Sequence, residues 1–116
     1  EGPLRISPRA LDALPVNATV SDEPGYYAAG RFGIRWENTL RVVPDPEHEG
    51  FLAFETLTRL PLARGAFDPS LLSEEEIRQI DIFHARVREE LLTLSLSEAA
   101  EAWLLRETRP LGKDPS

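Results

Sequence analysis

The chain lacks cysteine and methionine altogether, and it has no long apolar run. Without cysteine, a disulfide framework and a thiolate metal site are excluded. No apolar stretch approaches the ~20 residues of a membrane span, and the first residues do not read as a signal peptide. The chain also lacks an excess of positive charge, since 20 acidic residues outnumber 13 lysines and arginines and give a formal net charge of −7. This balance argues against non-specific binding to nucleic acid or to an anionic membrane, because both need a basic patch.

The first half of the chain has the pattern of β-strands. A short strand at about 18–23 ends at Pro24 and Gly25, which together are a strong turn signal. Residues 32–43 then alternate with the period of two that is typical of a half-buried strand. One face of that strand is apolar and the other polar: Phe32, Ile34, Trp36, Leu40 and Val42 against Arg35, Glu37, Thr39 and Arg41. A further strand is predicted over residues 51–58.

The second half changes to the helical period. Ser73 and Glu76 form a capping box ahead of an apolar stripe that predicts a helix over 74–94: Ile77, Ile80, Phe83, His84, Val87, Leu91 and Leu94. Ser95 and Glu98 repeat the capping signature, and a second helix is predicted over about 97–107, with Ala100, Trp103 and Leu104 facing inward. Strands followed by helices predict an α+β fold class.

Two glutamates are the candidates for chemistry. Glu37 shares the polar face of its strand with Arg35, and Glu23 lies at the end of the preceding strand. If the two strands pair, both carboxylates converge on one spot, where they repel each other unless a cation or a proton lies between them. A hard-metal site is one interpretation, with Arg35 orienting a ligand carboxylate. The alternative from spacing alone is two surface glutamates on a hairpin.

The residues around these glutamates resemble two motifs of a known family. Residues 21–27 read Ser-Asp-Glu-Pro-Gly-Tyr-Tyr, and residues 32–38 read Phe-Gly-Ile-Arg-Trp-Glu-Asn. Both resemble motifs of the Xaa-Pro aminopeptidases (aminopeptidase P), which belong to the pita-bread metallopeptidases. The resemblance implies that Glu23 ligates one metal and that Glu37 bridges two. It also implies that Arg35 contacts the metal ligands without binding the metal itself. One departure is Trp36, where the family usually has a β-branched aliphatic residue.

The remainder of the chain is similar to the C-terminal extension of the long, cytosolic-type enzymes of this family. Residues 54–58 and 60–62 are similar to the stretch that opens that extension, and residues 81–88 and 103–110 are similar to its helical end. We therefore expect residues 1–58 to be the last strands of a pita-bread catalytic domain, here incomplete. Residues 59–116 would be the helical extension.

Other ligands that the resemblance implies cannot be assigned in this sequence. The family uses two aspartates and a histidine as further metal ligands, and a second histidine for substrate binding and proton transfer. The chain begins Glu-Gly-Pro without methionine, similar to the end of a His-Glu-Gly-Pro motif, which we interpret as a cut just after that histidine. His48 is interpreted as a solvated loop residue and His84 as a hydrogen-bonded core residue. No catalytic residue is assigned within the chain.

The resemblance thus implies a segment of a metal-dependent exopeptidase that removes the residue preceding proline. It implies two divalent ions, usually Mn²⁺, peptide substrates with proline at the second position, a cytoplasmic location and a homodimer. Tyr26 and Tyr27 are candidates for lining a substrate pocket, although half-buried hairpin aromatics are an equal alternative. The missing N-terminal part of the enzyme would be a partner, and the chain alone is expected to be inactive. A stand-alone binding or dimerisation module, or an inactive truncated remnant, remains the alternative.

Overall fold

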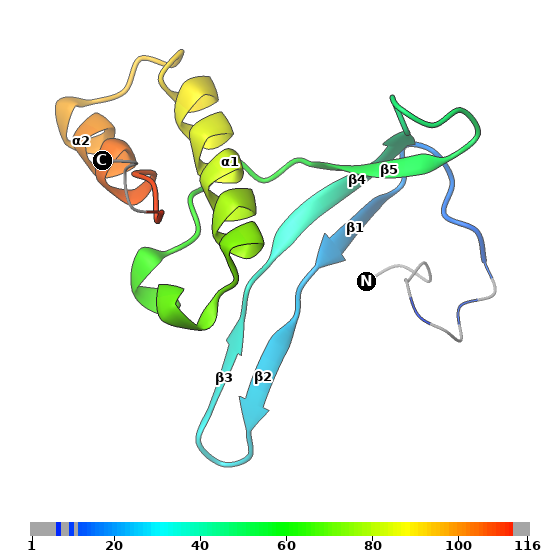
Figure 1. Ribbon diagram of the computed structural model, residues 1–116, viewed down its shortest axis with the longest axis horizontal. Helices are drawn as coiled ribbons and strands as arrows, with labels where there is room; N and C mark the ends of the chain where they lie inside the picture. The colour runs from blue at the N-terminus through cyan, green and yellow to red at the C-terminus, as the bar shows by residue number, and fades with distance from the viewer. Residues whose placement is uncertain (1–6, 8–9, 11, 113–116) are drawn as a thin grey trace. The chain divides into compact units, whose positions relative to one another are not determined.

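The computed structural model describes residues 7, 10 and 12–112, and it confirms the α+β class, with five short strands followed by two helices (Figure 1). The chain divides into two compact units, which we call unit 1 (residues 1–58) and unit 2 (residues 59–116). Unit 1 holds all the strands and unit 2 holds both helices. Residues Glu1 to Pro3, which we interpreted as the end of a His-Glu-Gly-Pro motif, lie outside the described residues.

Unit 1 contains two small antiparallel sheets. The first has the strand order β1-β4-β5, with β1 at Thr19–Asp22, β4 at Asn38–Pro44 and β5 at Leu52–Thr56. The second is a hairpin of β2 (Gly25–Ala28) and β3 (Phe32–Arg35). Gly30 has a positive φ of 68° in the turn of this hairpin, a conformation that glycine adopts without steric cost.

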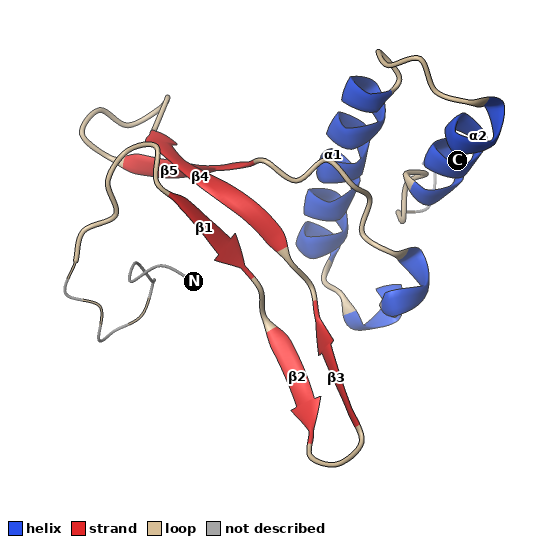
Figure 2. Ribbon diagram, turned by 180° about the vertical axis from the view of Figure 1, so that it is seen from behind, coloured by secondary structure: helices blue, strands red, loops and turns tan. Residues whose placement is uncertain are grey.

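The two sheets share one continuous register, so the hairpin prolongs β1 and β4 (Figure 2). The last pair of β1 and β4 is Asp22↔Asn38, and the first pair of the hairpin is Gly25↔Arg35. One-residue steps between these pairs place Glu23 opposite Glu37 and Pro24 opposite Trp36. The Trp36 N–H donates to the Pro24 carbonyl at 3.2 Å, but proline has no N–H to complete the pair. The predicted single strand over 32–43 is therefore interrupted at residues 36–37.

The apolar face of this two-stranded ribbon is largely exposed at the hairpin. Val42 is the one hydrophobic residue of unit 1 that is fully buried within the described part of the chain. In contrast, Tyr26, Phe32 and Ile34 are 67%, 48% and 52% exposed. The even-numbered side chains thus share one face, as the alternation predicts, but the described residues do not cover it.

Unit 2 begins with two single-turn helices, η1 (Arg64–Ala66) and η2 (Pro69–Leu71), followed by α1 (Glu74–Leu91) and α2 (Glu98–Glu107). The predicted capping box at the start of α1 is confirmed, because Ser73 and Glu76 bind each other's backbone N–H groups. The predicted cap of α2 was wrong. Ser97 caps this helix, because its extended backbone directs Oγ to the Ala100 N–H, 3.2 Å away, and Ser95 lies two residues too far upstream to do so.

The buried side chains of unit 2 come from one side of each helix. His84 and Val87 of α1 are fully buried, as are Leu104 and, one turn later, Thr108. The inward orientation predicted for Leu104 is confirmed, whereas Trp103 is 41% exposed. One residue turns a helix by about 100°, so Trp103 lies at the edge of the side that Leu104 and Thr108 define and stays partly exposed.

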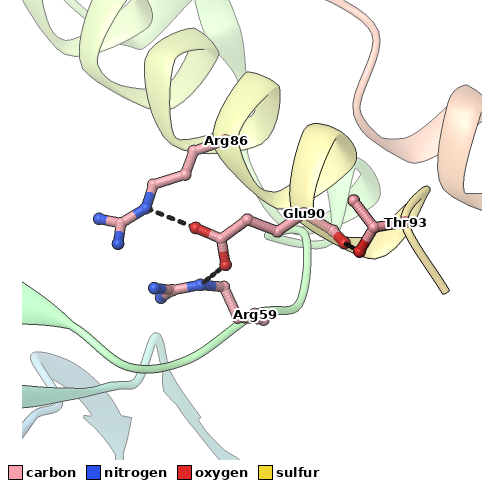
Figure 3. Close-up of polar contacts among 4 residues, drawn as sticks. All are labelled: Arg59, Arg86, Glu90 and Thr93. Atoms are coloured by element: carbon pink, nitrogen blue, oxygen red, sulfur yellow. Dashed lines mark hydrogen bonds and ion pairs between the residues drawn. The ribbon is translucent and has the colours of Figure 1, made fainter.

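Charged side chains of α1 also hold neighbouring segments of unit 2. Figure 3 shows the Glu90 carboxylate between two guanidinium groups, those of Arg86, at 2.9 Å, and Arg59. The Thr93 hydroxyl donates to the Glu90 backbone carbonyl at 2.6 Å, just past the helix end. Within the described residues, neither helix combines the length and the apolar character that crossing a bilayer requires.

Candidate metal centre

The candidate metal ligands, Glu23 and Glu37, face each other across the interruption of the ribbon. The register that continues from Asp22↔Asn38 to Gly25↔Arg35 makes the two glutamates direct cross-strand neighbours. Side chains that are directly opposite in an antiparallel pair project from the same face. The condition set by the sequence, that the two strands pair, is therefore met, and both carboxylates lie on the odd-numbered face of the ribbon.

The Glu23 carboxylate accepts hydrogen bonds from two donors on this face. Ser21 Oγ donates to Oε1 at 2.8 Å, and Arg35 Nη1 donates to Oε2 at 2.8 Å. These contacts lower the pKa of Glu23, the Ser21 hydrogen bond more than the Arg35 one. The pKa of Arg35 is correspondingly raised, mainly by its bond to Glu23, with smaller contributions from Tyr27 and Glu37. Glu23 is thus held as a carboxylate in one orientation.

Glu37 is exposed and has a different environment. Within the described residues it receives no hydrogen bond and forms no ion pair, and its charge acts on Arg35 only at longer range. Its neighbours along the odd-numbered face are Arg35 and Thr39, and the Thr39 backbone N–H donates to Thr58 Oγ1 at 2.8 Å. The two glutamates therefore differ, since one is pre-oriented and the other is open to a further partner.

The donor chemistry of this pair fits a hard divalent cation, but the set is incomplete. Carboxylate oxygens are the ligands that such cations prefer, and two of them on one face meet the first requirement. Across residues 12–112, no three or more histidine, cysteine, aspartate or glutamate side chains gather into a group that could hold a metal ion. The chain supplies two donors on one face, and any further ligands would have to come from elsewhere.

The two candidate pocket tyrosines lie on opposite faces of the hairpin. Tyr27 shares the odd-numbered face with Glu23, and its ring lies over two glycines, where a Cβ on Gly33 would come within 2.8 Å of its Cδ1 and one on Gly25 within 2.6 Å of its hydroxyl. Tyr26 is on the other face, 6.1 Å from the ring of Phe32. The structure therefore does not bring both tyrosines into one site, and contact with a substrate remains a prediction.

Sequence reasoning missed Ser21, although the signal was present. A hydroxyl two residues before a glutamate on a strand lies on the same face and within reach of its carboxylate. The sequence predicts that Arg35 orients a ligand carboxylate, and the carboxylate that it binds in the structure is that of Glu23. Arg35 reaches Glu23 diagonally across the two strands, because its direct partner in the register is Gly25. The sequence alone does not reveal this register.

Neither histidine of the chain joins these residues. His84 is fully buried, and its Nε2 accepts a hydrogen bond from the Leu62 N–H at 3.0 Å, which confirms the interpretation as a core residue. Burial lowers its pKa, and Arg64 adds to that effect. His48 lies in the loop after β4, exposed, with its Nδ1 3.2 Å from the Asp45 carboxylate.

Comparison with known proteins identifies the chain's relatives. The family model for the C-terminal region of peptidase M24 matches residues 50–111, more than half of the chain. The chain belongs to this family. The residues matched to the M24 C-terminal region run from the loop before β5 through α2 and on to Leu111, so Glu23 and Glu37 lie outside them.

Individual relatives of this M24 C-terminal chain extend the likeness over nearly all of it. A probable Xaa-Pro aminopeptidase P of Laccaria bicolor is 42% identical over 120 residues, which cover 96% of this chain and 19% of that protein. Aminopeptidase P2 of Arabidopsis thaliana is 40% identical over 120 residues, covering 97% of this chain and 17% of that protein. The chain thus spans about a fifth of the length of the relatives it matches.

A solved structure gives the same result in three dimensions. The X-prolyl aminopeptidase of Caenorhabditis elegans, described as a cytosolic enzyme with a di-nuclear active site, superposes with a TM-score of 0.78 at 34% sequence identity. The match covers 96% of this M24 C-terminal chain and 19% of the nematode enzyme. The likeness agrees with the family assignment from residues 50–111.

Proposed function

We propose that this chain is part of a metal-dependent Xaa-Pro aminopeptidase, in which Glu23 and Glu37 are ligands of two divalent metal ions. Such an enzyme removes the N-terminal residue that precedes proline. The observation that carries the proposal is the continuous register, which makes the two glutamates direct cross-strand neighbours on one face. The di-nuclear active site of the nematode relative supports it, because paired carboxylates on one face suit a pair of cations.

The residues on this face have different proposed roles. Glu37 is exposed and accepts no side-chain hydrogen bond from the described residues, and we propose that it bridges the two ions, while Glu23 binds one of them. Arg35 keeps Glu23 ionised and oriented through the 2.8 Å bond to Oε2. When bound, a pair of divalent ions activates a water molecule as the nucleophile and polarises the scissile carbonyl.

The rest of the proposal concerns the longer enzyme. Further ligands and the proton-transfer histidine would come from outside this chain, in the remaining strands of a pita-bread catalytic domain. Unit 2, which contains most of the residues that match the M24 C-terminal region, would be its C-terminal extension. We also propose Mn²⁺ as the metal, a cytoplasmic location and a homodimer as the assembled state.

Mutation of the full-length protein that carries this chain tests the proposal. Glu37→Ala should abolish turnover of an Xaa-Pro peptide and reduce the metal content measured by mass spectrometry, and Glu23→Ala should do nearly as much damage. Glu55→Ala is the control, because Glu55 is another strand glutamate paired with an arginine, Arg41, and should leave the chemistry intact. Near-normal turnover with full metal content in Glu37→Ala would show that the assignment is wrong.

A further inference from the structure

We propose that Ser21 is a positioning residue for this metal site, because its hydroxyl holds the Glu23 carboxylate in the orientation in which it meets a cation. The inference rests on the proposed function, in which Glu23 is a ligand. It goes beyond that proposal because it assigns a task to a residue that neither binds the metal nor touches the substrate.

The geometry places Ser21 as a fixed support for a mobile side chain. Ser21 is inside β1, where its pairing with Thr39 of β4 fixes the backbone. Glu23 lies just beyond the end of β1, where the ladder is interrupted at Pro24. A glutamate has three side-chain torsions, and outside a strand little restrains them. The hydroxyl two residues earlier on the same face supplies that restraint through a 2.8 Å hydrogen bond.

Ser21 and Arg35 act on different oxygens of the same carboxylate. Ser21 takes Oε1 and Arg35 takes Oε2, both at 2.8 Å. The two donors come from different strands, so together they fix both the position and the rotation of the carboxylate plane. An ionised carboxylate offers about four lone-pair sites, so each oxygen keeps one direction free for a cation. The side chain is therefore ordered before a metal arrives, which lowers the ordering cost of binding.

Thr39 provides a matched comparison for Ser21. It is directly opposite Ser21 in the register and also lies two residues from a candidate ligand, Glu37. No hydrogen bond between the Thr39 side chain and Glu37 exists within the described residues. A hydroxyl at this spacing is therefore not sufficient, and the Ser21–Glu23 contact is a specific feature of one strand.

The test compares Ser21→Ala, Ser21→Thr and Thr39→Ala in the full-length protein that carries this chain, and it measures the binding of Mn²⁺ to the metal-free protein by isothermal titration. Ser21→Ala should weaken Mn²⁺ binding by about tenfold, because the Glu23 carboxylate loses the donor at Oε1. Ser21→Thr keeps the hydroxyl and should retain the affinity, and Thr39→Ala should leave it unchanged.

Each outcome decides between the two proposals. An unchanged Mn²⁺ affinity in Ser21→Ala overturns the role of Ser21 and leaves the metal site standing. A loss of affinity that Ser21→Thr shows as well, or that Thr39→Ala shares, also overturns it, because the Ser21 hydroxyl is then not what supports binding. If the full-length Glu37→Ala variant binds Mn²⁺ as well as the wild type, the proposed metal site itself is refuted, and the positioning role with it. A loss of affinity in Ser21→Ala that is absent from Ser21→Thr supports the inference.

Discussion

Unit 1 and unit 2 differ in how far their polar side chains are buried. Unit 2 has exposed ion pairs, such as that of Arg86 with Glu90, but other side chains of this unit bind the backbone: the Asp81 carboxylate accepts the N–H groups of Leu111, at 2.7 Å, and Gly112, at 3.2 Å. Arg88 donates to the Thr108 carbonyl at 3.1 Å, and His84 accepts from Leu62. Side chains committed to backbone groups in this way stabilise a fold and have little capacity left for chemistry.

On the strands of unit 1 the charged side chains bind one another at exposed positions. Glu23 pairs with Arg35 on the two-stranded ribbon, and Glu55 of β5 pairs with Arg41 of β4 in the three-stranded sheet. These pairs are solvent-exposed and therefore contribute little to stability. The comparison teaches where to look for function in unit 1: its strand charges contribute little to the fold and lie where a ligand can reach them.

The largest expected effect is the complete inactivity of this chain alone. Unit 1 provides two carboxylates, whereas two divalent ions with an open position for water need a larger ligand set. The chain, incubated with an Xaa-Pro dipeptide and excess Mn²⁺, should release no free amino acid beyond a no-protein blank. Turnover above the blank would mean that unit 1 is chemically complete and that the contrast drawn here is incorrect.

The next effect concerns stability and belongs to unit 2. His84→Ala removes a fully buried side chain and leaves the Leu62 N–H without its acceptor. We expect a loss of about 2–4 kcal/mol in the free energy of unfolding, as for a core cavity combined with an unpaired polar group. The exposed His48 is the matched control, and His48→Ala should change stability by no more than about 0.5 kcal/mol. Equal effects in urea unfolding would contradict the contrast.

The same histidine should make stability depend on pH. Burial, aided by Arg64 and Arg88 against the opposing charges of Asp81 and Glu107, lowers the pKa of His84 below its usual 6.5. The unfolded chain therefore takes up this proton at a higher pH than the folded chain. The contribution of neutral His84 to the free energy of unfolding should be fully present above about pH 6.5. It should fall as the pH drops from there toward the pKa of His84 in the folded chain.

The pH range separates His84 from the carboxylates. The groups whose pKa is lowered, such as Glu23 and Glu90, start from 4.5, so they affect stability only in more acidic solution. His84→Gln keeps an acceptor for the Leu62 N–H but does not titrate near neutrality, and it should flatten the slope of stability against pH above about 5. His48→Gln should retain the slope. A slope that survives His84→Gln would assign it to another group.

The smallest effect is expected for the second ion pair of unit 1. Arg41 donates to Glu55 at 3.0 Å and 2.6 Å, and both side chains are partly exposed. A double-mutant cycle with Arg41→Ala and Glu55→Ala should give a coupling energy below about 1 kcal/mol. A coupling of several kcal/mol would show that the strand charges of unit 1 stabilise the fold as those of unit 2 do.

Much of this arrangement could be predicted from the sequence because local patterns dominate it. Alternation located the strands, and the capping box with its apolar stripe located α1, which ends at Leu91 rather than residue 94. The break at residues 36–37 was missed because its cause is Pro24, which lies on the opposite strand. The cap of α2 was misplaced because two serines compete for the task and only backbone geometry selects Ser97.

The site was predictable to a similar depth. Spacing and motif pointed to Glu23, Arg35 and Glu37, and the register shows that the two glutamates are neighbours. What the sequence could not supply was the pairing within the group, because the bond of Arg35 to Glu23 crosses the ribbon diagonally. For the same reason the two tyrosines, adjacent in sequence, were treated as one pocket although strand geometry puts them on opposite faces.

The most direct test of the metal-site proposal is anomalous diffraction at the manganese edge from crystals of the full-length protein grown with Mn²⁺. The account predicts two anomalous peaks beside the odd-numbered face of the ribbon. Carboxylate oxygens of Glu37 should contact both ions, and an oxygen of Glu23 should contact one of them. Peaks located elsewhere, or an ion pair without contact to Glu37, would contradict the assignment of these glutamates.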